Sequence, residues 1–210
     1  MVVKSFPPVE MADENGILAA GGDLDVETLI LAYSNGIFPW PHTGFPLLWF
    51  APPLRAVLFL DELHISKRLA RTRRNSTLTF SMNTDFNGVI SNCAASTTRS
   101  QRGTWITPEM EEAYCRLYEA GYAYSVEAYN GKRLVGGLYG VKIGKYWGGE
   151  SMFFLERDAS KLCFLYLMDH LKSEGIKWYD CQVINSLTES FGAREIPRDA
   201  FMNLLKKALS

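Results

Sequence analysis

The sequence predicts an α+β protein with a small N-terminal domain, residues 1–60, and a larger domain, residues 61–210, built on a mixed, largely antiparallel sheet. Three observations support this fold class. The chain has 210 residues, of which 47% are hydrophobic, so it can bury a sizeable core. Strand patterns follow one another between residues 122 and 154, and helical patterns flank them. A segment dense in proline, residues 38–55, sets the N-terminal part apart.

The N-terminal part contains one predicted helix and one unusual segment. The helix covers residues 26–35, with Asp25 at its start and Gly36 at its end. Residues 38–55 then contain five prolines and five Phe or Trp residues. Because proline fixes φ and lacks a backbone N–H, we expect neither a regular helix nor a central strand there. The segment is expected to form a rigid aromatic surface or the lining of a site, and residues 56–60 a short strand.

The first half of the larger domain is predicted to be mainly helical. A basic helix begins near His64, and residues 76–82 alternate as a strand does. A short helix is predicted over residues 84–94. The clearest helix of the chain covers residues 107–121, where Thr107 caps the start, a proline occupies the first turn and a glycine ends the helix.

The second half of this domain is predicted to begin with a meander of strands. Residues 122–129 and 133–143 are joined by Asn130-Gly131, a strong hairpin signal, and a second turn leads into residues 146–154. A buried helix, another strand and a last helix follow at residues 159–175, 176–184 and 197–210. This order of elements is compatible with a GNAT-type acyltransferase core.

Composition excludes several classes of protein. A net charge of −1 argues against a general nucleic-acid coat. The N-terminus lacks the apolar run of a signal peptide, and no stretch approaches the length of a membrane span, so we expect a cytoplasmic protein without a membrane. The cysteines are widely spaced and the three histidines stand apart from other ligands. We therefore expect reduced thiols and no metal.

Two polar residues interrupt the apolar strand predicted over residues 176–184. In an extended chain Asp180, Gln182 and Ile184 would share one face. Buried polar groups are costly unless they are hydrogen-bonded or used. The pair either satisfies backbone groups beside a bulge or forms a site, and a rigid strand that holds polar groups accurately favours the site. Glu150 follows two glycines in a neighbouring strand, where a structural ion pair and a contact with a bound cation both remain open.

Aromatic and basic residues give a second group of candidates. Trp40 and Trp105 either belong to the core or form a platform on which a nucleic-acid base stacks. Lys67, Arg71 and Arg74 lie on one side of the basic helix, which contains five cations and no acid between His64 and Arg74. This side is either an ordinary solvated surface or a contact for a phosphate backbone.

A set of ordered motifs makes the chain similar to one family. "GILAAGGDL", "GIFPW", "LLWFAP", "HISK", "GTWIT", "LVGGLYGV", "GESMF", "DASK" and "DCQV" occur in this order. In these motifs the chain resembles the leucyl/phenylalanyl-tRNA–protein transferases of the bacterial N-end rule pathway. The resemblance implies transfer of leucine or phenylalanine, less well methionine, from Leu-tRNA or Phe-tRNA to proteins with N-terminal Arg or Lys, which marks them for degradation. It also implies a GNAT-like second domain and a monomer that needs no cofactor.

The resemblance assigns roles to the candidate residues. Asp180 and Gln182 match the catalytic pair, Glu150 and Asp180 match residues that hold the acceptor N-terminus, and Trp40 and Trp105 match those that stack on the terminal adenosine of the tRNA. The positions of the aminoacyl side-chain pocket correspond to Leu138, Trp147, Met152, Phe164, Leu167 and Leu171. The basic cluster that grips the tRNA body corresponds to Lys67, Arg71 and Arg74.

The sequence departs from the family pattern near the expected site, where Leu187 stands in place of a usual polar residue. Two other functions remain as alternatives. An acetyl-coenzyme A-dependent acetyltransferase needs a glycine-bearing pyrophosphate loop, and the segment "LERDASK" before the buried helix contains no glycine. A non-catalytic module that binds RNA or N-termini would bind tRNA without transferring the amino acid.

Overall fold

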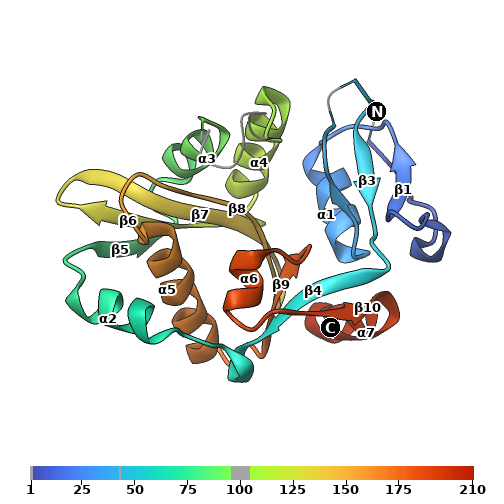
Figure 1. Ribbon diagram of the computed structural model, residues 1–210. Coiled ribbons are helices and arrows are strands. Elements are labelled where there is room, and N and C mark those ends of the chain that lie inside the picture. The colour runs from blue at the N-terminus through green and yellow to red at the C-terminus, as the bar shows by residue number, and fades with distance from the viewer. Residues whose placement is uncertain (1, 43, 96–104) are drawn as a thin grey trace.

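Two sheets of unequal size organise the chain (Figure 1). The computed structural model describes residues 2–42, 44–95 and 105–210. The small sheet has the order β1-β3-β2 and consists of β1 (Ile17–Ala20), β2 (Phe38–Pro39) and β3 (Leu48–Phe50). The predicted α+β class, with a small N-terminal part and a large mixed sheet, is confirmed.

The large sheet has seven strands in the order β10-β4-β9-β8-β7-β6-β5. They are β4 (Leu54–Phe59), β5 (Thr79–Met82), β6 (Ala123–Asn130), β7 (Arg133–Ile143), β8 (Tyr146–Phe154), β9 (Trp178–Gln182) and β10 (Arg194–Pro197). Neighbouring strands are antiparallel except β8 and β9, which are parallel. The predicted meander of β6, β7 and β8 is confirmed, with Gly131 and Gly144 at positive φ in its two turns.

Helices cover both faces of the large sheet (Figure 1). They are α1 (Val26–Ser34), α2 (Lys67–Asn75), α3 (Phe86–Ala95), α4 (Pro108–Glu119), α5 (Ala159–Ser173), α6 (Ser186–Ser190) and α7 (Arg198–Leu209), with 3₁₀ turns at Val9–Met11 and Leu60–Glu62. α3 and α4 pack on one face, and α5 packs on the other. Thr107 caps α4 by accepting a hydrogen bond from the Met110 N–H at 3.3 Å, as the sequence predicts.

The proline-dense segment differs in one respect from its prediction. Residues 48–50 form β3, which is the central strand of the small sheet, although a central strand was not expected there. The reason is that the prolines flank this short strand: Leu48, Trp49 and Phe50 all keep their backbone N–H groups. Proline occurs only in the edge strand β2 of this sheet, as Pro39.

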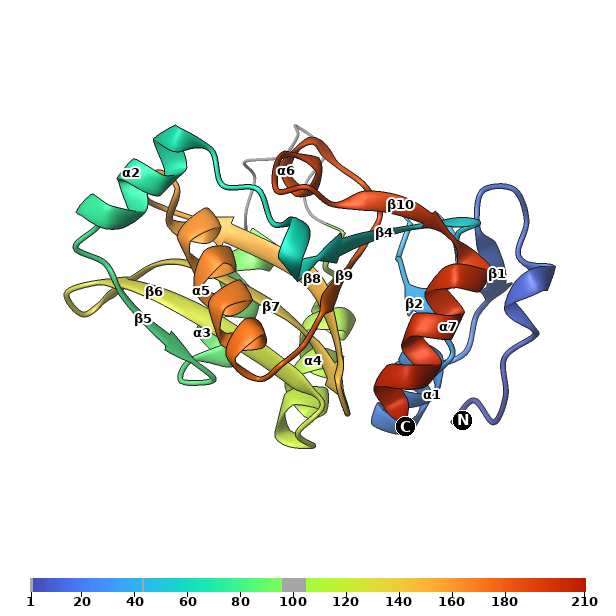
Figure 2. The same ribbon diagram turned by 90° about the horizontal axis from the view of Figure 1, so that it is seen from below.

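The N-terminal and C-terminal parts of the chain pack together. Strand β4 already lies in the large sheet, between β9 and β10. The C-terminal helix α7 lies alongside the small sheet and α1 in Figure 2, and Phe201 and Leu205 of α7 share a core with Tyr33 and Ile37. The division of the chain after residue 60 stays a prediction. No helix in the described ranges is long and apolar enough to cross a membrane.

Candidate active site

The site lies where strands β8 and β9 separate. Their parallel register consists of a single pair, Gly148 with Asp180. Beyond it, Glu150 on β8 is the extra residue of a β-bulge, because Tyr139 pairs with Ser151 whereas Gly140 pairs with Gly149. A bulge of this kind turns a side chain out of the regular pleat. The bulge therefore directs Glu150 away from the pleat at the point where the two strands part.

Gln182 ends β9 in an unusual backbone conformation. Its φ is 60°, in the left-handed region, and its N–H donates to Oδ1 of Asp180 at 2.8 Å. The simple alternation expected for Asp180, Gln182 and Ile184 is therefore wrong, because the strand stops at Gln182. As a result Asp180 is fully buried, whereas Gln182 is only partly buried and lines a cavity.

Glu150 lies at the centre of a hydrogen-bond cluster. Its Oε1 accepts a hydrogen bond of 2.7 Å from Nε2 of Gln182 and another of 2.7 Å from the Tyr33 hydroxyl. Tyr114 donates to Oε2 at 3.3 Å, and the two tyrosine hydroxyls also contact each other. The pKa of Glu150 is raised to about 7, mainly by burial and to a lesser extent by the nearby charge of Asp180, while these hydrogen bonds oppose the rise.

Asp180 belongs to a different, closed network. Its carboxylate forms a two-bond ion pair with Arg55, of 2.9 Å to Nε and 2.7 Å to Nη2, and accepts a third bond of 2.8 Å from the Tyr146 hydroxyl. Asp180 has no exposed surface and does not line the cavities described below. Its oxygens already accept hydrogen bonds from protein donors, and the predicted contact between Asp180 and the acceptor stays a prediction.

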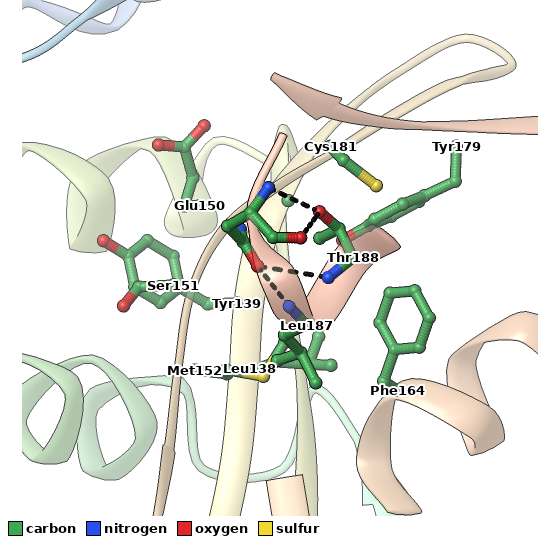
Figure 3. Close-up of a pocket in the computed structure, with 12 residues that line it drawn as sticks. Leu138, Tyr139, Glu150, Ser151, Met152, Phe164, Tyr179, Cys181, Leu187 and Thr188 are labelled. Atoms are coloured by element: carbon green, nitrogen blue, oxygen red, sulfur yellow. Dashed lines mark hydrogen bonds between the residues drawn. The ribbon is translucent and has the colours of Figure 1, made fainter. Parts of the chain in front are cut away.

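Two cavities meet beside Glu150. The larger, of about 240 Å³, brings together Trp40, Trp105, Glu150 and Gln182, which the sequence placed far apart. The smaller, of about 80 Å³, is mostly apolar and lies between β7, β8, α5 and α6 (Figure 3). Both cavities are lined by Gly149, Glu150, Cys181 and Asn185. We call them the large chamber and the small chamber. The shared residues show that the two chambers adjoin.

Half of the predicted side-chain pocket lines the small chamber. Leu138, Met152 and Phe164 do so. The other three predicted residues belong to the core behind it: Trp147 packs on Tyr124, and Leu167 and Leu171 are fully buried. Residues that the sequence did not indicate, among them Tyr139, Tyr179 and Cys181, complete the wall together with Leu187, which the sequence placed near the site. In Figure 3, Phe164 and Tyr179 lie on one side of this chamber and Tyr139 and Glu150 on the opposite side.

Helix α6 supplies one wall of the small chamber and is capped by the residue that precedes it, Asn185. The side chain of Asn185 accepts from the N–H groups of Leu187 and Thr188 at 3.0 and 3.1 Å, and the Thr188 hydroxyl accepts from the backbone N–H of Asn185 at 3.1 Å. This capping box fixes Leu187 against the chamber. The apolar Leu187 is thus part of the small chamber.

The basic side of α2 faces solvent. Lys67, Arg71 and Arg74 are exposed, and no ion pair involves them within the described residues. The other two arginines of this helix are paired: Arg68 with Asp158 at 2.7 Å, and Arg73 with Asp169. The sequence thus singled out the three cations of α2 whose charge is not balanced by a neighbouring acid.

Some site residues were missed. Tyr33, Tyr114 and Tyr146 surround the two carboxylates, yet tyrosine in an apolar context gives no signal that its hydroxyl faces an acid. Arg55 did give a signal in the sequence, because it is the charged residue in the apolar run "LRAVLF". In the structure it is only 1% exposed. Within residues 2–42, 44–95 and 105–210, no group of His, Cys, Asp or Glu is arranged to hold a metal ion.

Comparisons with known proteins match one family over most of the chain. A family model described as leucyl/phenylalanyl-tRNA protein transferase matches residues 57–206, and a model of the N-terminal domain of that family matches residues 22–53. A leucyl/phenylalanyl-tRNA–protein transferase from Flavobacterium johnsoniae is 52% identical over 96% of this chain and 95% of its own length. One from Chromobacterium violaceum is 48% identical over 96% of this chain and 87% of its own length.

Solved structures give more distant likenesses. The structure of L-PGS from Bacillus licheniformis has a TM-score of 0.45 and 13% identity, covering 87% of this chain and 70% of its own. A functionally unknown conserved protein from Staphylococcus epidermidis has a TM-score of 0.47 and 10% identity, covering 86% of this chain and 68% of its own. Structures this distant say nothing about function.

Proposed function

The chain belongs to the leucyl/phenylalanyl-tRNA–protein transferase family and is an enzyme that transfers leucine or phenylalanine from tRNA to protein N-termini, and from this premise we propose how its two chambers perform the transfer. The large chamber takes the terminal adenosine of the tRNA between Trp40 and Trp105. The small chamber takes the amino-acid side chain. The acceptors are proteins with N-terminal Arg or Lys.

The observation that carries this proposal is the wall that the two chambers share. In an aminoacyl-tRNA, the ester carbonyl connects the ribose to the amino acid. A donor with its adenosine in one chamber and its side chain in the other therefore places that carbonyl beside Gly149 and Glu150, next to Gln182. Base stacking on aromatic rings is worth about 1–3 kcal/mol and is supplied here by the tryptophans.

Gln182 is proposed to position the attacking amine. Its Nε2 donates a hydrogen bond to Oε1 of Glu150, which leaves the amide oxygen of Gln182 to accept a hydrogen bond from the α-amino group. The neutral amine nitrogen attacks the ester carbonyl, the new C–N bond forms and the bond to the ribose oxygen breaks. The proton that the amine loses goes to this oxygen, so the tRNA leaves with a free hydroxyl. Because the ester is already activated and an α-amino group has a pKa of about 7.7–8.0, positioning can supply much of the rate.

Glu150 is proposed to hold the positive charge of the acceptor's first residue. It is the carboxylate that lines both chambers, whereas Asp180 is enclosed by Arg55 and Tyr146. An ionised carboxylate in a partly buried site attracts the guanidinium or ammonium group of Arg or Lys more strongly than in water. Asp180 then acts on Gln182 rather than on the acceptor.

The exposed cations of α2 are proposed to contact phosphates of the tRNA body. Lys67, Arg71 and Arg74 carry no balancing acid, and phosphate contacts are independent of base sequence. Such contacts suit an enzyme that accepts different tRNAs carrying one amino acid. We further propose that the protein is cytoplasmic and acts as a monomer, and that its products enter the N-end rule pathway.

The test is transfer of labelled leucine from Leu-tRNA to an Arg-initiated peptide, with an Ala-initiated peptide as control. The proposal expects wild-type protein to label the Arg-initiated peptide and the Gln182→Ala protein to bind Leu-tRNA normally while transferring slowly. Equal transfer by both proteins would remove Gln182 from the mechanism. Tight binding of tRNA without any transfer by the wild type would favour the non-catalytic module.

A further inference from the structure

We infer that Arg55 is a positioning residue for aminoacyl transfer, which holds Gln182 in its working conformation through Asp180. This inference rests on the proposed role of Gln182. Arg55 lies on β4, the neighbour of β9 in the large sheet, and is 1% exposed. The strand register places the next residue, Ala56, opposite Gln182. Arg55 therefore acts from the interior, behind the chamber wall.

Every part of the Arg55 guanidinium is engaged. Nε and Nη2 bond the two oxygens of Asp180 at 2.9 and 2.7 Å, and Nη1 donates to the Gly36 carbonyl at 3.1 Å. The rings of Phe38 and Phe201 lie 4.6 and 4.5 Å from its central carbon. Burial lowers the pKa of Arg55, but the charge and hydrogen bonds of Asp180, together with Tyr146, raise it by more, so the group stays charged. The guanidinium is thus fixed in position and in charge.

Asp180 connects the fixed guanidinium of Arg55 to the backbone of Gln182. Its Oδ1, already held by Arg55, also accepts the Gln182 N–H at 2.8 Å. Gln182 has a φ of 60°, a strained conformation for a residue with a side chain, which persists only where its surroundings enforce it. The bond from Asp180 is one such constraint. It aims the Gln182 side chain at Glu150 and the chambers.

A role in stability alone does not account for this arrangement. Replacing a buried ion pair by apolar groups of similar volume is often neutral or stabilising, since two charges are costly to bury. Here the pair sits within the core formed by the small sheet, α7 and the large sheet, yet one of its oxygens points to the backbone of a residue in the chamber wall. The hydrogen bond from the Gln182 N–H thus connects the buried Arg55–Asp180 pair to the residue that is proposed to position the amine.

Arg55→Lys in the full chain tests the link, because lysine keeps the charge but cannot form the two-bond fork. The kcat for leucine transfer should fall about tenfold or more, as small misplacements of a positioning group do, while the KM for Leu-tRNA changes little. In a Gln182→Ala background the same substitution should cause no further fall in kcat, because the two residues act as one unit. A merely structural role would lower kcat in both backgrounds.

Two controls match the substitution. Arg194→Lys alters an arginine with the same kind of fork, to Glu62 at 3.1 and 3.2 Å, over the ring of Phe59 and outside the site, and should leave kcat unchanged. Val135→Ala removes buried apolar volume from β7 and should lower Tm without changing kcat. If Arg55→Lys does not fold, Asp180→Asn tests the same link from its other end, with the same two expected results.

Three outcomes overturn the inference. The first is an Arg55→Lys protein with wild-type kcat. The second is a fall in kcat of the same factor in the wild-type and Gln182→Ala backgrounds. Either would leave the proposed function intact, provided that Gln182→Ala alone is defective. The third is full activity of Gln182→Ala itself, which would refute the proposed role of Gln182 together with the inference that depends on it.

Discussion

The side-chain amide of Gln182 donates a hydrogen bond of 2.7 Å to Oε1 of Glu150. The two residues come from strands that have already separated, so this bond spans the gap between β8 and β9 beside both chambers. It couples the charge of one residue to the orientation of the other. An ionised Glu150 holds Nε2, which leaves the amide oxygen of Gln182 for the incoming amine.

Acceptor binding should depend on pH through Glu150. With a pKa of about 7, this carboxylate is largely ionised at pH 8 and largely protonated at pH 6. The affinity for an Arg-initiated peptide should therefore fall about tenfold between pH 8 and pH 6, as expected when a hydrogen-bonded charge is lost. Equilibrium binding of the peptide without donor tRNA measures this. The Glu150→Gln protein should bind the peptide weakly at both pH values and should not show this tenfold fall in affinity.

Glu62→Gln is the control for that experiment, because Glu62 is an exposed carboxylate paired with Arg194 and outside the site. It should reproduce the wild-type pH profile. The comparison also separates Glu150 from the α-amino group of the peptide, which titrates identically in all three proteins. A Glu150→Gln protein with the wild-type profile would contradict the assignment of Glu150 to the acceptor.

Stability should also depend on pH through Glu150, with a definite sign. Its folded-state pKa of about 7 lies above the ordinary value of 4.5, so the protonated form is favoured by folding. The resulting stability is present below pH 4.5 and is lost as pH rises through 7. The free energy of unfolding of wild type relative to Glu150→Gln should therefore drop by about 1–3 kcal/mol between pH 5 and pH 8. Urea denaturation at both values tests this, and a constant difference would contradict the raised pKa.

The size of the small chamber should set the preference between leucine and phenylalanine. At about 80 Å³ it is smaller than a cavity of about 150 Å³ that admits benzene, so a benzyl side chain requires movement of the wall. Met152→Ala should raise the kcat/KM ratio of Phe-tRNA to Leu-tRNA about tenfold, within the range that small changes in an apolar pocket allow. Met168→Ala, on α5 and away from the chamber lining, is the matched control and should leave the ratio unchanged.

Local pattern predicted most of the elements because their signals are local. α4 has its cap, proline and terminal glycine within one short stretch, and β6 to β8 have turn residues between alternating runs. β2 and β3 were not predicted, and neither were α6 and the strands β1 and β10. Strands β1 and β10 have four residues each and are completed by partners far along the chain, so tertiary pairing decides them.

The sequence indicates which residues meet at the candidate site better than it indicates the contacts between them. Glu150 and Gln182 stand out as polar residues in apolar strands, and both line the large chamber. Nothing in the sequence shows that Asp180 faces Arg55, 125 residues away, because that pairing depends on β4 lying next to β9. The break in alternation at Gln182 was equally hidden, since glutamine rarely adopts a positive φ.

The basic side of α2 should contribute to tRNA affinity through counterion release. Changing Lys67, Arg71 and Arg74 together to alanine removes three cations that have no acidic partner in the described structure. The slope of log affinity for Leu-tRNA against log salt should become shallower by about 2 to 3, since each phosphate contact contributes slightly less than one unit. Lys145, Lys177 and Lys207 line a separate hollow beside α7 and provide a control that removes equal charge elsewhere. If α2 contacts the tRNA directly, only the α2 variant should change the slope. An equal change in both triple variants would show that the net charge of the protein, rather than the basic side of α2, governs binding.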